Sequence, residues 1–261
     1  MKRLLTATVA TLALAMPASA HFQLIFNPEA NPTAPAEMPL HLIFWHPFEN
    51  GHAMDMGTPE ELFYVFRGER IDISDSLTPM TFTGAHNSAT GFEATLPVRR
   101  NGDYTVVLVP EPYFEESEGI YIQQLTTVYF NKGGIPTDWN EPVGLPTEFV
   151  PLNRPYNVIA GSTFSAQLLS DGEPVPGAEI EVEYLAAEPD METRTAGDPS
   201  VGPMPGGAIV AMTDENGVFT FGVPRAGFWG FAALGAGPET EHDGTDLSQD
   251  AVIWIRAYDM E

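Results

Sequence analysis

Short runs of β-branched and aromatic residues, each closed by a glycine or proline turn, extend along almost the whole sequence. The chain has 24 glycines and 24 prolines in 261 residues. A representative run is Tyr104–Val109, which follows the turn residues Asn101-Gly102. Beyond the first twenty residues we find no stretch with the 3.6-residue period of an amphipathic helix. Many short strands with regular turn signals predict an all-β fold of the sandwich type.

The strand pattern divides into two halves. Residues 131–155 are rich in Gly, Pro and Asn and have little periodicity, so we expect a crossing between two β-sandwich-like domains, 21–150 and 151–261. In the second half, Glu179–Tyr184 alternates charged and apolar residues, which predicts a strand with one wet face and one buried face. Residues 186–207 form a polar insertion rich in Pro and Gly.

The first twenty residues have the order of a secretory signal. Met1-Lys2-Arg3 is basic, Leu4–Met16 is apolar, and Ala18-Ser19-Ala20 is a small-x-small cleavage pattern. We therefore expect residues 1–20 to be a cleaved signal peptide and the mature protein to be periplasmic. The alternative is an N-terminal membrane anchor, but the apolar run is short for a span. No later stretch is long and apolar enough, so we expect no direct membrane insertion.

Charge and cysteine content exclude several classes of partner. The formal net charge is −25, and loss of Lys2 and Arg3 with the signal leaves 9 basic against 36 acidic residues, or −27. Such acidity excludes nucleic acid and anionic membranes as partners, although it is also what solvation of an exported protein requires. The chain has no cysteine, so a transition metal would have to use nitrogen, oxygen or thioether ligands.

Cleavage after Ala20 would make His21 the first residue of the mature chain. Its free α-amino group and its Nδ1 atom can then close a chelate ring on one metal ion. Both groups have reference pKa values near neutrality, about 8 and about 6.5, so both are available as neutral ligands at modest proton cost. Ni(II), Co(II) and Cu(II) all suit such nitrogen donors. The alternative is that cleavage leaves an arbitrary histidine.

Further histidines and methionines follow on the second strand and its loop. His41 and His46 differ in parity, so on a regular strand they point to opposite faces. His46 ends the strand, and His52, Met54 and Met56 lie on the loop after it. We rank His46 above His52, and His52 above His41, as metal ligands. The methionine thioethers suit copper(I), so copper stays a candidate metal. The alternative is that the two methionines only pack within the loop.

The remaining candidates are weaker. Glu115, with Glu116 and Glu118 beside it, could supply oxygen ligands or accept a histidine N–H, although such runs are often plain surface loops. His86 and His242 stand alone in polar loops and are expected to be surface histidines. The sequence has no G-x-S-x-G, H-E-x-x-H, phosphate-binding glycine loop or nucleophilic cysteine, so we expect no enzyme.

Several stretches together resemble a family of exported proteins that accompany nickel and cobalt uptake transporters. They are His21, Trp45-His46-Pro47-Phe48-Glu49-Asn50-Gly51 with Met54-x-Met56, Pro112-Tyr113-Phe114-Glu115, Gly144-Leu145-Pro146-x-Glu148-Phe149-Val150-Pro151-Leu152, Gly172-x-Pro174-Val175-Pro176-Gly177-Ala178, Thr213-Asp214-x-Asn216-Gly217-x-Phe219, Arg225-Ala226-Gly227-Phe228-Trp229-Gly230-Phe231 and Ser248-Gln249-Asp250-Ala251. The resemblance runs over nearly all of the mature chain, and the order of these stretches is more specific than any one of them.

The resemblance implies a periplasmic component that binds Ni(II), or else Co(II), for transporter components in the inner membrane. It also implies two β-sandwich-like domains, the second transthyretin-like or carboxypeptidase-regulatory-like, with His21 and His46 as ligands. Many relatives carry a histidine on the strand where this chain has Ile122-Gln123-Gln124-Leu125, so Gln124 or His52 would have to replace it, or the site would have fewer ligands. The chain also lacks the C-terminal membrane helix of some relatives, so we expect it to diffuse freely.

Three functions stay open at this stage. The first is a nickel or cobalt carrier that serves an uptake transporter. The second is a copper protein with an N-terminal histidine, either a carrier or an oxidative enzyme. The third is an adhesive or structural β-module that binds no metal.

Overall fold

The regular secondary structure of the described residues is almost all β-strand, as the sequence predicts. A computed structural model describes residues 21–202 and 209–260, and within them the one regular element besides strands is a 3-10 turn, η1 (Ser74–Ser76). The predicted signal peptide, residues 1–20, lies outside the described residues. None of the described residues forms a helix that could cross a membrane.

The first sheet, sheet A, carries the N-terminal edge of the described chain. Its strands are β1 (Phe22–Phe26), β2 (Ala36–Trp45), β3 (Ala53–Met54), β6 (Thr78–Thr83), β7 (Ser88–Val98), β16 (Pro189–Asp190) and β17 (Thr195–Ala196). They run in the order β1-β2-β7-β6-β17-β16, with the short β3 paired to the end of β2. The β16–β17 hairpin comes from the predicted polar insertion 186–207, so part of that insertion extends the sheet of the other half.

Sheet B is the largest and contains strands from both halves of the sequence. They are β4 (Glu61–Phe66), β5 (Glu69–Asp72), β8 (Gly102–Val109), β9 (Tyr113–Glu115), β10 (Ile120–Lys132), β12 (Val158–Ile159), β15 (Glu179–Tyr184), β18 (Ile209–Met212), β20 (Gly227–Ala233), β21 (Glu241–His242) and β22 (Thr245–Tyr258). The main order is β18-β15-β20-β22-β10-β8-β4-β5. The halves join where β10 and β22 pair in parallel, from Tyr121↔Leu247 to Val128↔Trp254.

Sheet C is small and belongs to the second half. Its strands are β11 (Thr147–Pro151), β13 (Thr163–Ser170), β14 (Glu173–Pro174) and β19 (Val218–Gly222). The expected boundary between residues 150 and 151 therefore lies inside β11, which pairs with β13 from Thr147↔Ser170 to Pro151↔Ala166. Of the crossing that the sequence predicts over 131–155, only residues 133–146 and 152–155 are irregular.

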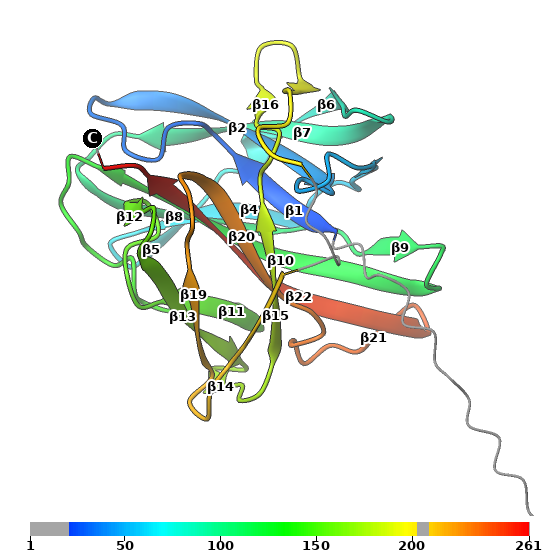
Figure 1. Cartoon of the computed structure of the whole chain (residues 1–261). Coiled ribbons are helices and arrows are strands. Elements are labelled where there is room, and N and C mark those ends of the chain that lie inside the picture. Colours follow the sequence, from blue (N-terminus) through cyan, green and yellow to red (C-terminus); the bar gives the residue numbers. More distant parts are fainter. Residues whose placement is uncertain (1–20, 203–208, 261) are drawn as a thin grey trace, which may run out of the picture.

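Sheets A and C pack against opposite faces of sheet B, so that the three sheets form layers (Figure 1). Successive residues of a strand point to opposite faces, and β22 shows this directly. Val252 and Trp254 join the core shared with sheet A, whereas Ile253 and Ile255 join the core shared with sheet C. Strand β22 is apolar throughout its middle because it is covered on both faces. These packed layers are the predicted β-sandwich architecture.

The prediction that one face of Glu179–Tyr184 is exposed to solvent is wrong for two of its three glutamates. Glu181 and Glu183 are each 6% exposed, although they alternate with the buried Ile180 and Val182. Strand β15 lies inside sheet B between β18 and β20, and the loop after β2 reaches it, where the Phe48 N–H donates to Glu183 Oε2 at 3.0 Å. The alternation of charged and apolar residues predicted the strand correctly, but tertiary packing buries both of its faces.

Candidate metal centre

The two histidines ranked highest from the sequence lie against each other. His21 immediately precedes β1 and His46 immediately follows β2. The antiparallel register pairs Phe22 with Trp45, so the next residue outward on each strand falls at the same end of sheet A. The two rings are 4.4 Å apart between centroids, at 63°.

Glu115 completes this arrangement from a different element. It ends β9, which pairs with the start of β10, and its Oε2 atom lies 3.0 Å from His21 Nε2. Its Oε1 atom accepts from Ser117 N at 2.9 Å and from Ser117 Oγ at 2.6 Å. Burial works to raise the pKa of Glu115, but the Ser117 hydrogen bonds and the two histidines outweigh it, so that the pKa is lowered.

The protonation pattern suits metal binding. Burial lowers the pKa of both His21 and His46, that of His46 to about 4, with His21 and His52 adding to the effect at His46. Both rings are therefore neutral at neutral pH, the form in which imidazole binds a metal. Because the Glu115 carboxylate is ionised, the proton shared with His21 lies on Nε2. That leaves His21 Nδ1, the atom needed for a chelate with the amino terminus, unprotonated.

An open pocket of about 560 Å³ surrounds these groups. Its lining comprises His21, His46, His52, Ala53, Met54, Asp55, Tyr113, Glu115, Ser117 and Glu118. The pocket thus gathers side chains from the start of β1, the loop after β2, and the β9–β10 hairpin. Within the described residues, no three His, Asp or Glu side chains converge closely enough to enclose an ion by themselves.

The turn at Asn50-Gly51 holds His46 in place. Gly51 N donates to the His46 carbonyl oxygen at 2.9 Å, and Trp45 Nε1 donates to the Gly51 carbonyl oxygen at 3.0 Å. A Cβ atom at Gly51 would lie 2.9 Å from His46 Cβ and 3.1 Å from His46 Nδ1. Only glycine allows this approach without displacing the imidazole.

His52 lies in the pocket beside a histidine that the sequence did not single out. The expected solitary histidine, His86, stacks on His52 with ring centroids 5.4 Å apart and an interplanar angle of 18°. Both residues are exposed. No sequence spacing signals this contact, because 34 residues separate the two and only the pairing of sheet A brings their loops together.

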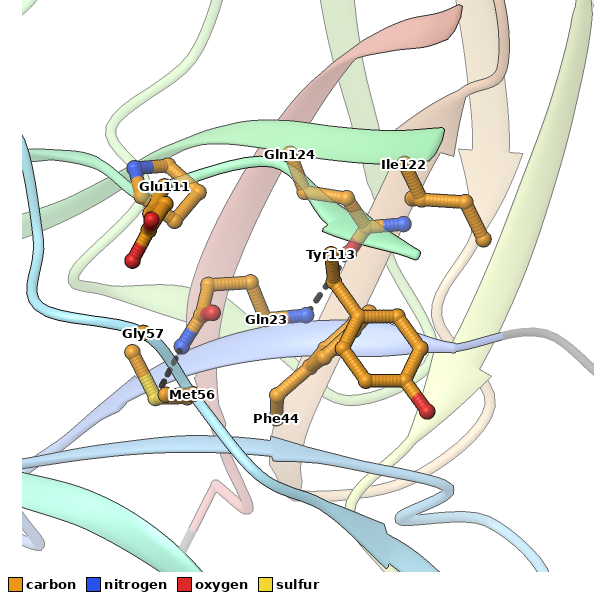
Figure 2. A pocket seen from close by; sticks show the side chains of 9 residues that line it. Gln23, Phe44, Met56, Gly57, Glu111, Tyr113, Ile122 and Gln124 are labelled. Atoms are coloured by element: carbon orange, nitrogen blue, oxygen red, sulfur yellow. Dashed lines mark hydrogen bonds between the residues drawn. The ribbon is translucent and has the colours of Figure 1, made fainter. Parts of the chain in front are cut away.

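Met56 and Gln124 line a second, smaller pocket (Figure 2), which shares Tyr113 with the histidine pocket. Met56 Sδ accepts from Gln23 Nε2 at 3.4 Å, whereas Met54 lines the histidine pocket. The Gln124 amide is already engaged, since its Oε1 accepts from Gln23 N at 2.7 Å and its Nε2 donates to the His21 carbonyl oxygen at 2.7 Å. Gln124 therefore holds the backbone of His21 and Gln23 in place.

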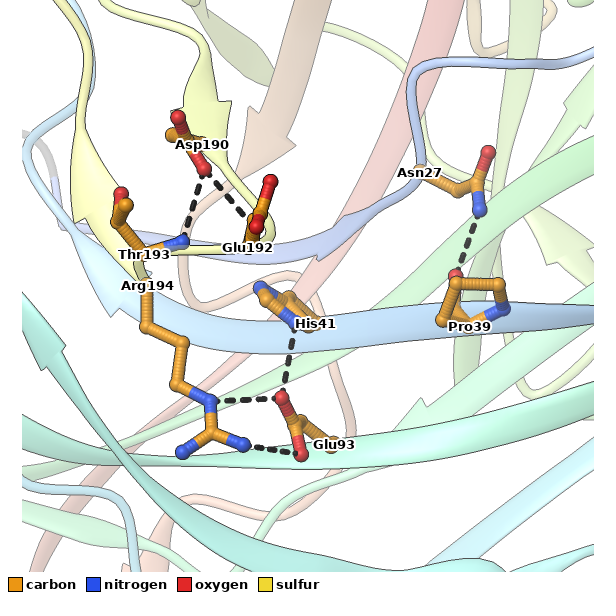
Figure 3. A network of polar contacts seen from close by, with 8 residues as sticks. All are labelled: Asn27, Pro39, His41, Glu93, Asp190, Glu192, Thr193 and Arg194. Atoms are coloured by element: carbon orange, nitrogen blue, oxygen red, sulfur yellow. Dashed lines mark hydrogen bonds and ion pairs between the residues drawn. The ribbon is translucent and has the colours of Figure 1, made fainter.

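The other two histidines lie outside the pocket. His41 is 2% exposed and its Nε2 is 3.2 Å from Glu93 Oε1, a carboxylate that also binds Arg194 of the β16–β17 hairpin (Figure 3). His41 therefore ties sheet A to the inserted hairpin. His242 packs its ring on Tyr121, with centroids 4.7 Å apart.

Comparison with known proteins identifies a family. Residues 18–237 match the family described as "Domain of unknown function (DUF4198)". The chain belongs to this family. The match covers the whole pocket of this DUF4198 protein, from His21 to Glu118, and most of both halves. No curated protein matches the chain.

Solved structures give only remote likenesses to this DUF4198 protein. The D0-D1 domain of Intimin is 11% identical over 89% of this chain and 98% of its own, with a TM-score of 0.21. PorU from Porphyromonas gingivalis is 10% identical over 92% of this chain and 21% of its own, at 0.22. E. coli alpha-2-macroglobulin is 11% identical over 92% of this chain and 14% of its own, at 0.23. Such TM-scores carry no argument about function.

Proposed function

We propose that this protein is a periplasmic carrier that captures Ni(II), or else Co(II), as cargo for an uptake transporter in the inner membrane. The observation that carries the proposal is the meeting of His21 and His46 at one end of sheet A, with Glu115 on His21 Nε2. The pairing of imidazole with an outer carboxylate is the usual arrangement around a histidine that binds metal.

The amino terminus supplies the third nitrogen in this proposal. In the precursor the His21 nitrogen is an amide and a poor ligand. Cleavage after Ala20 converts it into an amine, which closes a chelate ring with Nδ1 of the same residue while His46 binds from the neighbouring strand. Export and creation of the metal site are then one processing event, so that the precursor in the cytoplasm does not compete for metal.

The surroundings support a carrier more than an enzyme. The pocket, at about 560 Å³, has room for an ion with its waters or with a small chelating molecule. A net charge of −27 after cleavage raises the local concentration of cations. We propose no catalytic step at this pocket.

Titration of two proteins with Ni(II) tests the proposal. One protein begins at His21, and the other carries a single extra glycine before it, both in a buffer that does not bind metal. We expect one tight equivalent in the first and at least a roughly 10-fold weaker one in the second, because the extra residue replaces the amine by an amide. Equal affinities would refute the terminal chelate, and a flat calorimetric trace with every divalent metal would favour a metal-free β-module.

Copper is the second candidate cargo, because a thioether lies in the pocket. Met54 lines it beside His46 and His52. Met56 lies in the neighbouring pocket, so a Met-x-Met pair does not face the histidines, and this favours Cu(II) over Cu(I). Cu(II) outcompetes Ni(II) at most nitrogen sites, so affinity cannot decide between them. The metal content of protein purified from its native periplasm, without added metal, decides it. Copper-dependent oxidation of a polysaccharide would instead indicate an oxidative enzyme.

A further inference from the structure

We infer that His52, on the wall of the pocket, and His86, which stacks on it, form an outer binding site for a divalent transition-metal ion, from which the ion passes inward to His21 and His46. The outer site itself stands on its own geometry. Its role in loading the inner site rests on the proposed function. The inference concerns a histidine pair contributed by two separate loops.

The two rings are close enough to bind one ion at two points once they rotate, because an imidazole binds metal in the plane of its ring and the stacked rings do not yet converge. The rings stack at 5.4 Å between centroids and 18° between planes, on exposed side chains that can adjust by rotation about their side-chain bonds. Imidazole is a good ligand for Ni(II), Co(II), Cu(II) and Zn(II). An ion held by two imidazoles keeps several water ligands, which can be exchanged for other groups one at a time.

The backbones that carry the two rings are tied together. Asn87 Oδ1 accepts from Ala53 N at 2.9 Å, and Asn87 Nδ2 donates to the Ala53 carbonyl oxygen at 2.7 Å. Gly84 N donates to the Asn87 carbonyl oxygen at 2.9 Å, which closes the turn that presents His86. Because each histidine is adjacent to one member of this Asn87–Ala53 pair, the two rings are held near each other before any metal arrives.

The outer pair is continuous with the inner site. His52 lines the same pocket as His46, and Asp55 lies on its wall with an oxygen already accepting from Thr90 N at 2.7 Å. An ion on His52 and His86 thus needs only to exchange ligands along one open surface. Two monodentate imidazoles hold an ion less tightly than a terminal chelate with a third nitrogen, so transfer runs inward.

A titration with Ni(II) alone tests the outer site, using the processed protein and the variants His86→Gln and His242→Gln. We expect two equivalents in the wild type and in His242→Gln, which changes a half-buried histidine away from the pocket, but one in His86→Gln. In His86→Gln the inner site should keep its affinity for Ni(II), and stopped-flow mixing should show that this site fills more slowly than in the wild type. Proton resonances of the His86 ring should broaden when the second equivalent of Ni(II) binds.

A protein with an extra residue before His21 separates this inference from the proposed function. If the terminal chelate is right, the inner equivalent of this protein should bind at least roughly 10-fold more weakly, whereas the outer equivalent should keep its affinity and be removed by His86→Gln. Two equivalents in His86→Gln, or an unchanged filling rate, would overturn the outer site while leaving the inner one in place. Loss of both equivalents in His86→Gln would overturn it too, since the pair would then belong to one shared site.

Discussion

At the scale of single residues, the site depends on which nitrogen of His21 carries the proton. Glu115 accepts from Nε2 and is itself held by Ser117 through both N–H and hydroxyl. The carboxylate orients the ring and leaves Nδ1 for the metal ion that we propose. An outer carboxylate of this kind acts through the ligand and does not touch the ion.

Replacement of Glu115 by glutamine should weaken Ni(II) binding roughly 10-fold, because removal of such a partner costs 10- to 100-fold in affinity. Glutamine keeps the shape but removes the charge that favours the Nε2 tautomer. Calorimetric titration measures the change. The matched control is Glu116→Gln, on the exposed neighbouring residue, which should bind as the wild type does. Equal binding by both variants would contradict the role of Glu115.

Gly51→Ala should also weaken Ni(II) binding, because the new methyl group would lie 2.9 Å from His46 Cβ and push the imidazole aside. We expect a destabilisation of about 1–3 kcal/mol from the overpacking, with affinity falling further than folding alone explains. Gly222→Ala is the control, since a Cβ atom there meets nothing within 4 Å. Denaturant melts and titrations of the two variants separate stability from binding. A Gly51→Ala protein with wild-type affinity would show that the position of His46 is not decisive.

At the scale of elements, strand β15 buries charge that the sequence places on a surface. Burial, with Glu179 and Asp250 nearby, raises the pKa of Glu181 to about 7. Burial raises the pKa of Glu183 well above its usual value and that of Asp250 to about 6. A carboxyl group whose folded pKa is raised binds more protons when folded, so its stabilising contribution is complete below the unfolded pKa and is lost as pH rises through the folded pKa.

Glu181→Gln should therefore be more stable relative to the wild type at pH 8 than at pH 5. The folded pKa of about 7 against an ordinary value of 4.5 limits the gain to about 3 kcal/mol, at about 1.4 kcal/mol per pKa unit. The lowered pKa of His46 has the opposite effect, since it reduces stability as pH falls below about 6.5. The stability of the variant must therefore be compared with that of the wild type at each pH. Urea melts at both pH values measure it. Exposed Glu173→Gln should show no such dependence, and an equal difference at pH 5 and pH 8 would contradict the raised pKa.

At the scale of the whole molecule, the two halves share sheet B through the parallel pair β10 and β22. Trp254 lies at this junction, where its Nε1 donates to the Gln23 carbonyl oxygen at 2.8 Å and its ring meets Phe22 at 5.8 Å. A continuous sheet covered on both faces couples the halves. We therefore expect one cooperative unfolding transition.

Trp254→Phe should lower the stability of both halves together by about 1–3 kcal/mol, because it leaves a buried carbonyl group without its donor. Hydrogen exchange can follow β8 in the first half and β13 in the second. The free energy of opening that hydrogen exchange reports should fall by the same amount in both strands. If β13 loses protection while β8 keeps it, or if calorimetry resolves two transitions, the halves fold independently.

Much of the fold was predictable because strand signals are local. The runs Tyr104–Val109 and Glu179–Tyr184, which the sequence predicts as strands, lie in β8 and β15. Strand β11 is among those that the sequence did not predict, because it lies in a stretch whose periodicity is too weak to stand out. The prediction that failed concerns the burial of strand β15. Its residues alternate as those of a half-exposed strand do, yet its neighbours in sheet B and the loop after β2 cover its charged face as well.

For the candidate site, the sequence by itself determined the ligand chemistry: no thiolates, a histidine at the predicted cleavage point, and another at a strand end. Only the tertiary structure decided which of these groups meet. The β1–β2 register set His21 beside His46, the β9–β10 hairpin added Glu115, and the pairing of loops in sheet A brought His86 to His52. The physical reason is that residue type is a local property, whereas proximity between residues dozens of positions apart depends on strand pairing over the whole sheet.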